Sequence, residues 1–457
     1  MIKLAERELI APLDEKARRL VSSTSARDGH HIAPRPTSIL CLHRTQSSFL
    51  ELDKWDTMTA MTATIAVPPS AQAPTAAVGA ALRAFVAGGK EIRLSPLWKQ
   101  AFAGKRKDYR YYDIVEDTMH PEITHRYLMI TDQLSQAGTV QPFFVTSIDM
   151  AEGVSNSVKS WIDTVRRAWP GFLRTRVLMV GCVAGEGVLD GDVTWQMQCI
   201  PMLKDALVEE AYKLGASLIV FKEFRASHRA VLDRLQADGF ARVPSMPMTR
   251  LNFDFDSFDE YLSNKLGSAT RKNLRRKFKA IDAVDPIELT VSTNIEAEVD
   301  ELYPLYLQIY EKSSMHFEKL TPEFLVQLGR AMPDKVRYFV WRQNGRPIAF
   351  SICTIDGDTI CDEYIGIDYQ SSVSAGLYHY TFRDIVNWAL GNGLKAYAST
   401  GLSYDPKLHL KQELVPLDLY VRHRSTIGNF VMKYIVRWLD PTRHDKTLAE
   451  FSNYADL

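Results

Sequence analysis

The stretch Ser371-Ser372-Val373-Ser374-Ala375-Gly376 joins a strand-like segment, residues 358–367, to a helix-like segment, residues 377–390, and this junction decides the fold. Four apolar side chains recur at helical spacing after the stretch: Tyr378, Phe382, Ile385 and Ala389. A loop of small residues that leads into a helix offers unpaired backbone N–H groups, and the helix dipole strengthens their attraction for anions. The junction therefore predicts a binding site for phosphate-like anions.

The same succession of strand, loop, helix and strand occurs earlier in the chain. Residues 177–182 and 217–221 are typical of buried strands, and a helix is expected between them at 203–213. The segments 212–219 and 390–397 have similar positions in the two halves, which indicates a divergent internal duplication. This alternation of strands and helices predicts an α/β (α+β) fold.

A hairpin is expected ahead of the strand at 358–367. Residues 336–341 and 347–352 are strand-like, and the dipeptide Asn344-Gly345 between them is typical of a two-residue hairpin turn. The last strand of the chain is expected at Lys395–Ser399.

Length and composition describe a globular protein of more than one domain. At 457 residues the chain is too long for one ordinary core. The five cysteines are few and scattered, which favours reduced thiols and a cytoplasmic location. No stretch approaches the roughly 18 consecutive apolar residues of a membrane span, and the N-terminus is not typical of a secretory signal. The net charge is zero, so affinity for a nucleic acid would require a local basic patch.

These observations divide the chain into four parts. Residues 1–80 are expected to form a poorly ordered extension with one short helix near Leu4–Leu20, because proline-rich tracts interrupt regular structure there. The two domains are predicted at 81–255 and 256–425, and a helical tail at 426–457.

Several common sites are not supported by the sequence. A glycine cluster follows the first buried strand, at Gly181, Gly185, Gly187 and Gly191. Its spacing does not fit a dinucleotide fingerprint, and two acidic residues occur where a pyrophosphate would lie, so we interpret it as a flexible loop. His120 and His125 lack the spacing of a metal motif, and we predict no metal site. A phosphate-binding P-loop and a serine-hydrolase elbow are also absent from the sequence.

A basic helix is predicted over residues 268–279. No acidic residue occurs between Tyr261 and Ile281, so positive charge accumulates over three turns. The helix is either a solvated amphipathic face or a surface that contacts phosphates of a cofactor, a carrier protein or tRNA. Arg271 and Arg275 are the candidate phosphate ligands.

The segment Gly401–Lys407 follows the expected last strand. Loops at strand ends in α/β sheets often carry ligand-binding groups. Tyr404 is a candidate proton donor, and Lys407 is a candidate charge stabiliser. The alternative is a surface turn formed by Asp405-Pro406.

Residues from about 255 to 420 resemble the FemAB-like branch of the GNAT acyltransferase superfamily. The resemblance depends on an ordered set of segments: 258–262, 270–277, 317–324, 345–350, 364–368, 374–377 and 401–407. Residues from about 85 to 250 are similar to the non-catalytic first domain of these two-domain proteins. The resemblance implies tandem GNAT-like domains, each with a mixed central sheet flanked by helices.

The resemblance also implies how an acyl donor would bind. The pyrophosphate loop of GNAT enzymes aligns with residues 370–375, where Val373 replaces a glycine and would crowd a pyrophosphate. The implied donor-binding residues are Gln370, Ser371, Ser372, Ser374, Ala375 and Gly376, together with Arg271 and Arg275. No permanently bound cofactor is expected, and the co-substrate would be an acyl-CoA or an acyl-carrier thioester.

The catalytic assignment rests on three residues. Asp362 and Glu363 point to opposite faces of a strand, so only one of them can face the cleft, and Glu363 is favoured as the base. Tyr404 would act as an acid. Lys407, from its family position, would contact the acyl donor or stabilise charge.

The expected function is that of an N-acyltransferase. It would transfer an acyl group from a thioester, either acyl-CoA or a carrier protein, to an amine such as an amino acid or a biosynthetic intermediate. One alternative is a Fem-type peptidyltransferase that uses aminoacyl-tRNA, with the basic helix contacting the tRNA. Another is a non-catalytic binding protein with a degenerate GNAT fold, which the Val373 substitution would explain.

Overall fold

The computed structural model describes residues 82–119, 123–132, 137–149, 163–167, 174–313, 318–371, 373–438, 440, 442 and 445–457. The predicted extension 1–80, with its helix at Leu4–Leu20, lies outside the described residues. Ser372 and His120 also lie outside them.

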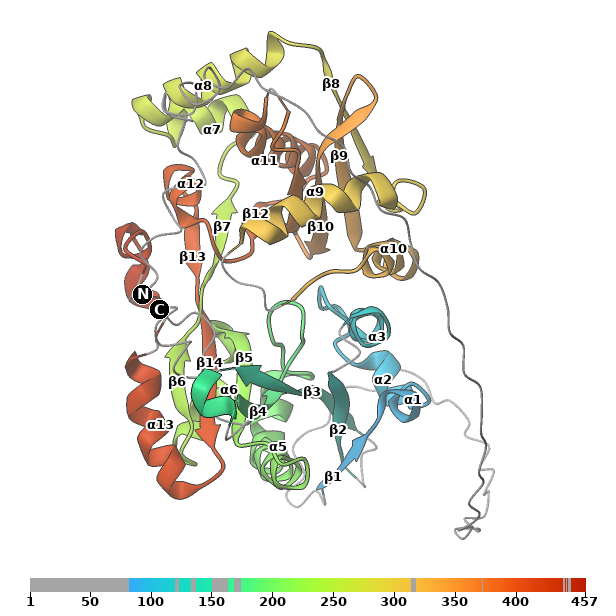
Figure 1. Cartoon of the computed structure of the whole chain (residues 1–457), viewed down its shortest axis with the longest axis vertical. Coiled ribbons are helices and arrows are strands. Elements are labelled where there is room, and N and C mark those ends of the chain that lie inside the picture. The colour runs from blue at the N-terminus through green and yellow to red at the C-terminus, as the bar shows by residue number, and fades with distance from the viewer. Residues whose placement is uncertain are drawn as a thin grey trace, which may run out of the picture. The chain divides into compact units, whose positions relative to one another are not determined.

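Seven strands form a first sheet in the order β1-β2-β3-β4-β5-β14-β6 (Figure 1). Their bounds are β1 Leu82–Ala87, β2 Thr124–Asp132, β3 Gly138–Asp149, β4 Arg174–Val180, β5 Leu218–Arg225, β14 Leu417–His423 and β6 Ala241–Pro244. All neighbours are antiparallel except β4 and β5, which are parallel.

Seven strands form a second sheet in the order β13-β7-β12-β11-β10-β9-β8. Their bounds are β13 Glu413–Val415, β7 Met248–Asn252, β12 Ala396–Ser399, β11 Thr359–Ile367, β10 Arg346–Asp356, β9 Val336–Gln343 and β8 Ile287–Ser292. The parallel pair here is β11 and β12. Both sheets thus contain four antiparallel strands, a parallel neighbour and two further antiparallel strands, which confirms the predicted plan of mixed sheets in two halves.

The two sheets exchange one strand each. The strand β7 lies in the predicted first domain but pairs with β12 and β13 of the second sheet. The strand β14 lies in the predicted second domain but pairs with β5 and β6 of the first sheet. The domain boundaries stay a prediction, whereas the expectation that Lys395–Ser399 is the last strand is wrong, because β13 and β14 follow it.

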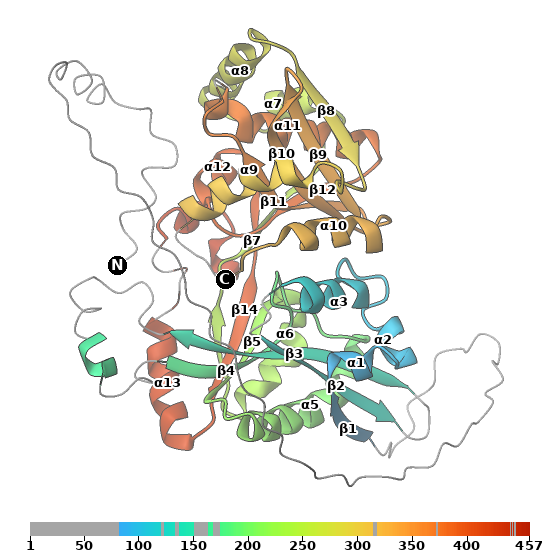
Figure 2. The same ribbon diagram turned by 45° about the vertical axis from the view of Figure 1, so that its right-hand side comes forward.

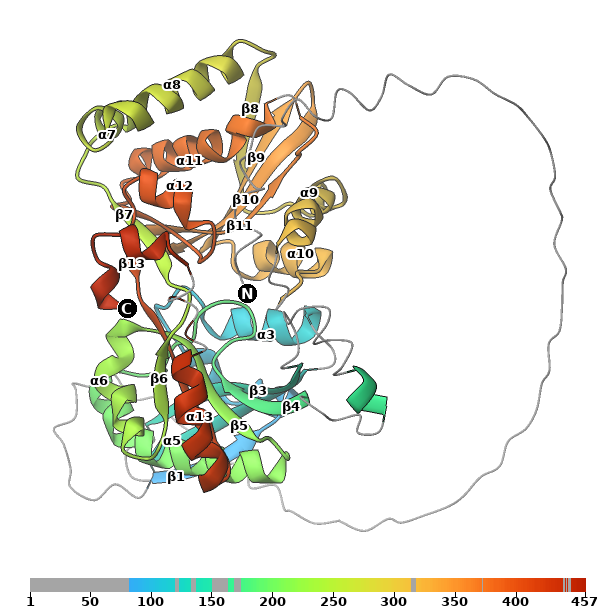
Figure 3. The same ribbon diagram turned by 60° about the vertical axis from the view of Figure 1, so that its left-hand side comes forward.

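Helices cover both faces of each sheet (Figure 2). Their bounds are α1 Gly89–Ile92, α2 Pro96–Gln100, α3 Tyr109–Thr118, α5 Val193–Lys213, α6 Arg229–Leu232, α7 Phe258–Asn264, α8 Ser268–Asp282, α9 Val299–Lys312, α10 Pro322–Ala331, α11 Ser374–Gly391, α12 Tyr404–His409 and α13 Thr426–Trp438. Helices α5 and α6 pack on the first sheet, and α7, α8 and α11 pack on the second. The helices α1 to α3, α9 and α10 share one core between the sheets. Figure 3 shows α13 beside β6 and β14.

The core between the sheets joins the two halves directly. The ring of Tyr111 on α3 meets that of Phe324 on α10 edge to face, with 6.0 Å between the centroids. The Thr321 hydroxyl donates to the Thr118 carbonyl at 3.0 Å. The first half therefore contributes directly to the surroundings of the second sheet.

Local sequence explains the main elements. The predicted hairpin is confirmed, because Asn344 and Gly345 have φ angles of 52° and 76° between β9 and β10. Helix α5 begins ten residues before the predicted start, at Val193, where the Asp192 side chain accepts a hydrogen bond from the Trp195 N–H at 2.9 Å. The prediction missed this part because Pro201 lies inside the helix.

None of the helices within the described ranges is long and apolar enough to cross a membrane.

Candidate active site

The parallel strands β11 and β12 diverge at their carboxyl ends and form a fork. Their register runs from Thr359 opposite Ala396 to Asp362 opposite Ser399, and the pairing ends there. Ligand sites in open α/β sheets lie beyond the carboxyl ends of such strands. The fork of the second sheet is therefore a candidate ligand site.

A β-bulge distorts β11 at the fork. The register with β10 passes from Cys353 opposite Asp362 to Ile352 opposite Tyr364, so Glu363 is the extra residue. A bulge leaves the extra residue out of the regular ladder, and bulges are frequent next to active sites. The Glu363 carbonyl accepts a hydrogen bond from the Thr400 hydroxyl at 3.4 Å, which ties the bulge to the end of β12.

Asp362 lies at the fork, on the face of the sheet that α11 covers. Its Oδ2 accepts a hydrogen bond from the Tyr397 hydroxyl at 2.8 Å, and the Cys353 Sγ lies 3.8 Å from its Oδ1. Burial raises the pKa of this carboxyl to about 6, although the Tyr397 hydrogen bond and the charge of Lys407 oppose the shift. The residue as a whole is partly exposed.

Lys407 is buried beside Asp362. It projects from α12, its side chain is 5% exposed, and its Nζ donates to the Thr400 carbonyl. Burial lowers the pKa of this amine to about 7, and Asp362 attracts its charged form and limits the shift. A lysine with a pKa near neutrality can accept or donate a proton at physiological pH.

The turn that leads to α12 is strained. Leu402 and Ser403 both have left-handed backbones, with φ angles of 76° and 51°, which non-glycine residues rarely adopt. Such strain is often found at functional sites. The predicted acid Tyr404 follows this turn, but its hydroxyl donates to the Pro247 carbonyl at 2.8 Å in a small separate core cluster.

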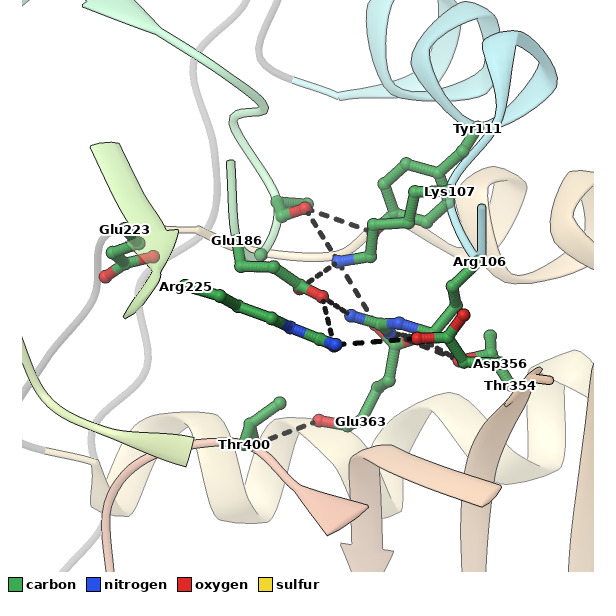
Figure 4. A network of polar contacts seen from close by, with 12 residues as sticks. Arg106, Lys107, Tyr111, Glu186, Glu223, Arg225, Thr354, Asp356, Glu363 and Thr400 are labelled. Carbon is green, nitrogen blue, oxygen red and sulfur yellow. Dashed lines mark hydrogen bonds and ion pairs between the residues drawn. The ribbon is translucent and has the colours of Figure 1, made fainter. Parts of the chain in front are cut away.

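Glu363 points to the opposite face, as the sequence predicted, into a buried network of charges between the two halves (Figure 4). Its carboxylate pairs with Arg106 and lies 3.3 Å from the Nζ of Lys107. Arg106 also pairs with Glu186, and Lys107 lies 3.3 Å from the same carboxylate. Arg225 contacts Glu186 at 3.0 Å, and these contacts connect the first half to the bulge of β11.

This network holds its acids in the charged form. Burial alone would raise the pKa of Glu363, but Arg106 and Lys107 lower it below its usual value. The pKa of Glu186 is lowered well below its usual value by the same two cations and by Arg225. A carboxylate engaged in this way is a poor proton acceptor, so the geometry favours Asp362 over Glu363 as a reacting group. The catalytic roles predicted for Glu363, Tyr404 and Lys407 stay predictions.

The predicted anion loop is largely engaged with itself. The Gln370 N–H donates to the Asp368 Oδ1 at 2.9 Å, and the Ser371 N–H donates to the Asp368 carbonyl at 3.2 Å. The Ser374 N–H donates to the Ser371 carbonyl at 3.1 Å, and the Gly376 N–H donates to the residue 373 carbonyl at 3.0 Å. An anion at this loop would have to compete for these donors or use other N–H groups, such as that of Ala375 near the start of α11.

The position of Val373 in the structure does not produce the crowding of a pyrophosphate that the sequence led us to expect. Its φ angle is −101°, which is ordinary for any residue, and its side chain is 6% exposed within the core of the second sheet. The methyl groups thus point into the protein. The replacement of a glycine at this position is therefore compatible with an open loop surface.

The loop and the basic helix, two separate predictions, lie side by side. A Cβ on Gly376 would lie 2.8 Å from the Ile281 Cδ1 and 3.7 Å from the Lys277 Cβ, so only glycine allows α8 and α11 to approach this closely. Arg271 donates to the Ser263 carbonyl at 2.8 Å. Arg275 is exposed, as are Lys272, Arg276 and Lys279.

Lys277 faces α11 rather than solvent. Its Nζ lies 3.3 Å from the His379 Nδ1, and burial lowers the pKa of both groups, that of His379 to about 3. The positive charge of Lys277 thus lies next to a neutral imidazole near the start of α11.

A cleft of about 560 Å³ lies beside the loop. It is lined by residues of α9, of the β9–β10 hairpin and of the segment after β11, namely Glu301, Pro304, Leu305, Gln308, Gly345, Arg346, Pro347, Asp368 and Gln370. The predicted donor residue Gln370 therefore faces a space of ligand size. Within the described residues, no group of three His, Cys, Asp or Glu side chains could hold a metal ion.

Sequence reasoning missed the partners that decide which carboxylate is free. Arg106 and Lys107 belong to a short basic run at 105–107 with no recognisable motif. Glu186 is one of the two acidic residues in the glycine cluster, and the sequence does not reveal its cationic partners. A Cβ on Gly185 would lie 1.9 Å from the Lys107 Nζ, so this cluster makes room for a buried lysine. The glycine pattern at 181–191 was the signal in the sequence that could have pointed to this buried lysine.

A comparison with known protein families identifies a domain in the second half. Residues 268–406 match the family model described as an acetyltransferase (GNAT) domain. Curated relatives in two strains of Mycobacterium tuberculosis, each named putative 8-amino-7-oxononanoate synthase 2, are 22% identical over 374 residues. The match covers 76% of this chain and 46% of the relatives, so the chain spans about half of their length.

Three solved structures are similar to parts of this chain at low sequence identity. FemX is 10% identical, with a TM-score of 0.43 over 68% of this chain and 91% of FemX. A tandem GNAT protein from the clavulanic acid pathway is 10% identical, with a TM-score of 0.40 over 75% and 99% of the two chains. The C-terminal domain of a putative lysylphosphatidylglycerol synthetase from Agrobacterium fabrum is 14% identical, with a TM-score of 0.39 over 58% and 82%. The match to the acetyltransferase (GNAT) domain model thus covers residues 268–406, which include the fork of the second sheet.

Proposed function

We propose that this protein is an N-acyltransferase whose reaction takes place at the β11–β12 fork. The observation that carries the proposal is the pair formed by Asp362 and Lys407, whose pKa values burial moves to about 6 and about 7. Perturbed groups of this kind cluster at functional sites. The GNAT fold supports transfer of an acyl or aminoacyl group in general, and the thioester donor and amine acceptor are our proposal.

In the proposed reaction the amine nitrogen attacks the carbonyl carbon of the thioester. The neutral Lys407 amine accepts the proton that the attacking nitrogen loses, and Asp362 stabilises the resulting ammonium. The C–S bond then breaks, and Lys407 returns the proton to the leaving thiolate. The backbone N–H of the bulged Glu363 is a candidate donor to the oxyanion, because the bulge removes it from the regular ladder.

The proposed donor lies with its phosphates near the start of α11. Helix α8, which also carries exposed cations, packs against the first turn of α11, and both a basic helix and a helix N-terminus favour anions. Val373 leaves the loop surface open, which supports coenzyme A as well as a carrier-bound phosphopantetheine.

The test is a turnover assay that measures thiol release. Acetyl-CoA, a long-chain acyl-CoA and an acyl-carrier thioester are each offered with a panel of primary amines, including the nine-carbon amino acid in the name of the curated relatives. We expect thiol release that requires an amine and falls at least about 100-fold in Lys407→Met. The exposed Lys395→Met variant should keep full activity.

Thermal-shift titration with the same donors separates binding from turnover. Saturable stabilisation that grows with donor concentration indicates binding to the folded protein. Stabilisation without turnover for every donor and amine would favour the non-catalytic binding protein. The absence of both would reject the thioester donor.

An aminoacyl-tRNA donor is a second candidate, because four exposed cations lie on one helix, at Lys272, Arg275, Arg276 and Lys279. Binding of tRNA through these residues should weaken steeply with salt. Filter binding of aminoacyl-tRNA at low and high salt, with and without Arg275→Ala and Arg276→Ala, tests this alternative. Unchanged binding in the double variant would reject the contact with α8.

A further inference from the structure

Helix α13 carries its largest apolar side chains on the outside. Ile427 is 82% exposed, Phe430 65%, Val431 48% and Tyr434 62%. These positions are spaced i, i+3, i+4 and i+7, so they form one stripe along the helix. The rings of Phe430 and Tyr434 meet edge to face at 5.2 Å.

The face of α13 that packs on the protein includes polar contacts to neighbouring elements. The Asn429 side chain donates to the Gly239 carbonyl at 2.9 Å and accepts from the His423 N–H at 2.9 Å. A Cβ on Gly428 would lie 2.2 Å from the His423 ring, so the helix approaches β14 through a glycine. Met432 adds a partly buried contact to the core. Hydrogen bonds therefore fix which face of the helix is turned outward.

Such an arrangement is unusual in a surface helix, because the apolar stripe ordinarily faces the core. Scattered exposed apolar residues are common, but this stripe is contiguous. Among the described residues, four of the large exposed apolar side chains lie on this one helix, whereas Leu94, at 85% exposure, lies elsewhere in the chain. The outer face of α13 is thus suited to a second, apolar environment.

The charge around the stripe indicates which environment. No acidic residue occurs from residue 419 to 439, whereas Arg422, Arg424 and Lys433 lie within that segment. This excess of positive charge occurs in a chain whose net charge is zero. Tyr212 is 57% exposed and donates to the Arg424 carbonyl at 3.4 Å, which adds an aromatic ring next to the start of α13.

We propose that α13 lays its outer stripe on an anionic lipid bilayer surface. Interfacial helices combine apolar and aromatic residues that enter the boundary of the acyl chains with cations that contact anionic headgroups. A second copy of this chain fits less well, because a two-fold contact through the stripe would bring two basic segments together. A bilayer of this kind offers acyl chains to the apolar stripe and anionic headgroups to the basic residues of the same segment.

Vesicle flotation of the full chain tests the proposal. Vesicles of phosphatidylcholine alone are compared with vesicles that also contain phosphatidylglycerol, at low and high salt. We expect flotation with the anionic vesicles, weakened by salt. The double variant Ile427→Ser/Phe430→Ser should bind at least about tenfold more weakly, and Lys433→Glu should weaken binding on anionic vesicles only.

Leu94→Ser is the matched control, because it removes an equally exposed apolar side chain elsewhere and should leave flotation unchanged. Thermal melts of all variants check folding, and the exposed positions predict unchanged midpoints. Flotation that is equal in the double variant and the wild type would overturn the proposal. The absence of flotation would also overturn the proposal. Light scattering would then show whether the stripe instead joins two copies of the chain, in a dimer that the double variant dissociates, or whether the protein is a monomer.

Discussion

The two sheets have the same plan, but their forks differ. In the first sheet, β4 and β5 pair from Val177–Leu218 to Val180–Phe221, and the chain then returns so that Gly187 bridges to Phe224. A Cβ on Gly187 would lie 2.5 Å from the Phe224 ring, so the returning loop fills the fork. In the second sheet, no such bridge is seen beyond Asp362 and Ser399 among the described residues.

The difference shows how one topology supports two roles. We call the fork of the first sheet, which the loop around Gly187 fills, the closed fork, and the fork of the second sheet the open fork. In the closed fork, the loop carries Glu186, and cations hold this carboxylate charged in a network that joins the halves. In the open fork, Asp362 and Lys407 have pKa values that approach each other. Groups whose charges are fully paired support structure, whereas groups with pKa values near neutrality support proton transfer.

The largest expected effect comes from removing the charge at the centre of the closed fork. Arg106→Leu removes one of the two cations that Glu186 and Glu363 share and leaves only Lys107 beside both buried carboxylates, so we expect a loss of about 3–5 kcal/mol in the free energy of unfolding. Urea denaturation measures this change. Arg330→Leu removes an exposed pair with Glu296 and should have a much smaller effect. Equal losses in the two variants would mean that the network does not join the halves.

Adding a methyl group to the loop of the closed fork should destabilise the protein less than Arg106→Leu does. In Gly185→Ala the new Cβ would meet the Lys107 Nζ, and the backbone has a φ of +87°, so we expect a loss of about 2–4 kcal/mol. Gly393→Ala is the control, since its φ is +74° with nothing within 4 Å of the new Cβ. The difference between the two melting midpoints isolates the contact with Lys107. A difference of zero would contradict the packing role of Gly185.

The open fork should determine the pH dependence of activity. Lys407 has a pKa lowered to about 7, so its neutral form accumulates as pH rises through that value. We expect kcat/KM to rise about tenfold per pH unit below 7 and to level off above it. The assay needs a donor and an acceptor that do not themselves titrate between pH 5 and 8. A profile that is flat over this range would exclude Lys407 as the base.

The smallest expected effect separates the two members of the open pair. Asp362 attracts the charged form of Lys407, so Asp362→Asn should move the midpoint of the pH profile to lower pH. At pH 7 the neutral fraction of Lys407 would then increase by at most about twofold. Asp356→Asn, which alters a carboxylate in the network around Arg225, should leave the midpoint in place. A shift to higher pH in Asp362→Asn would contradict the pairing.

Much of the fold could be predicted because it depends on local signals. The Asn344-Gly345 turn, the strand at 358–367 and the helix after the small-residue loop all follow from neighbouring residues. The pairing of β7 and β14 could not be predicted, because both are short strands whose partners are chosen by the rest of the sheet.

The candidate site was only partly predictable for the same reason. Alternation along β11 correctly separated Asp362 from Glu363, but the choice between them depends on Arg106, 257 residues away in the sequence. The orientation of Val373 depends on the packing of α8 against α11. Long-range contacts of this kind have no local pattern to reveal them.

The exchange of strands between the sheets has a consequence for synthesis on the ribosome. The edge strand β6 reaches the first sheet only through β14, which lies between it and β5. After Pro244 has been made, the ribosome must add residues up to His423 before β14 is available, which takes roughly 10 to 35 seconds. During that interval the amino-terminal half is a nascent chain with an incomplete sheet. Its maturation therefore waits for the carboxyl-terminal half, and the two halves are committed to folding as one unit.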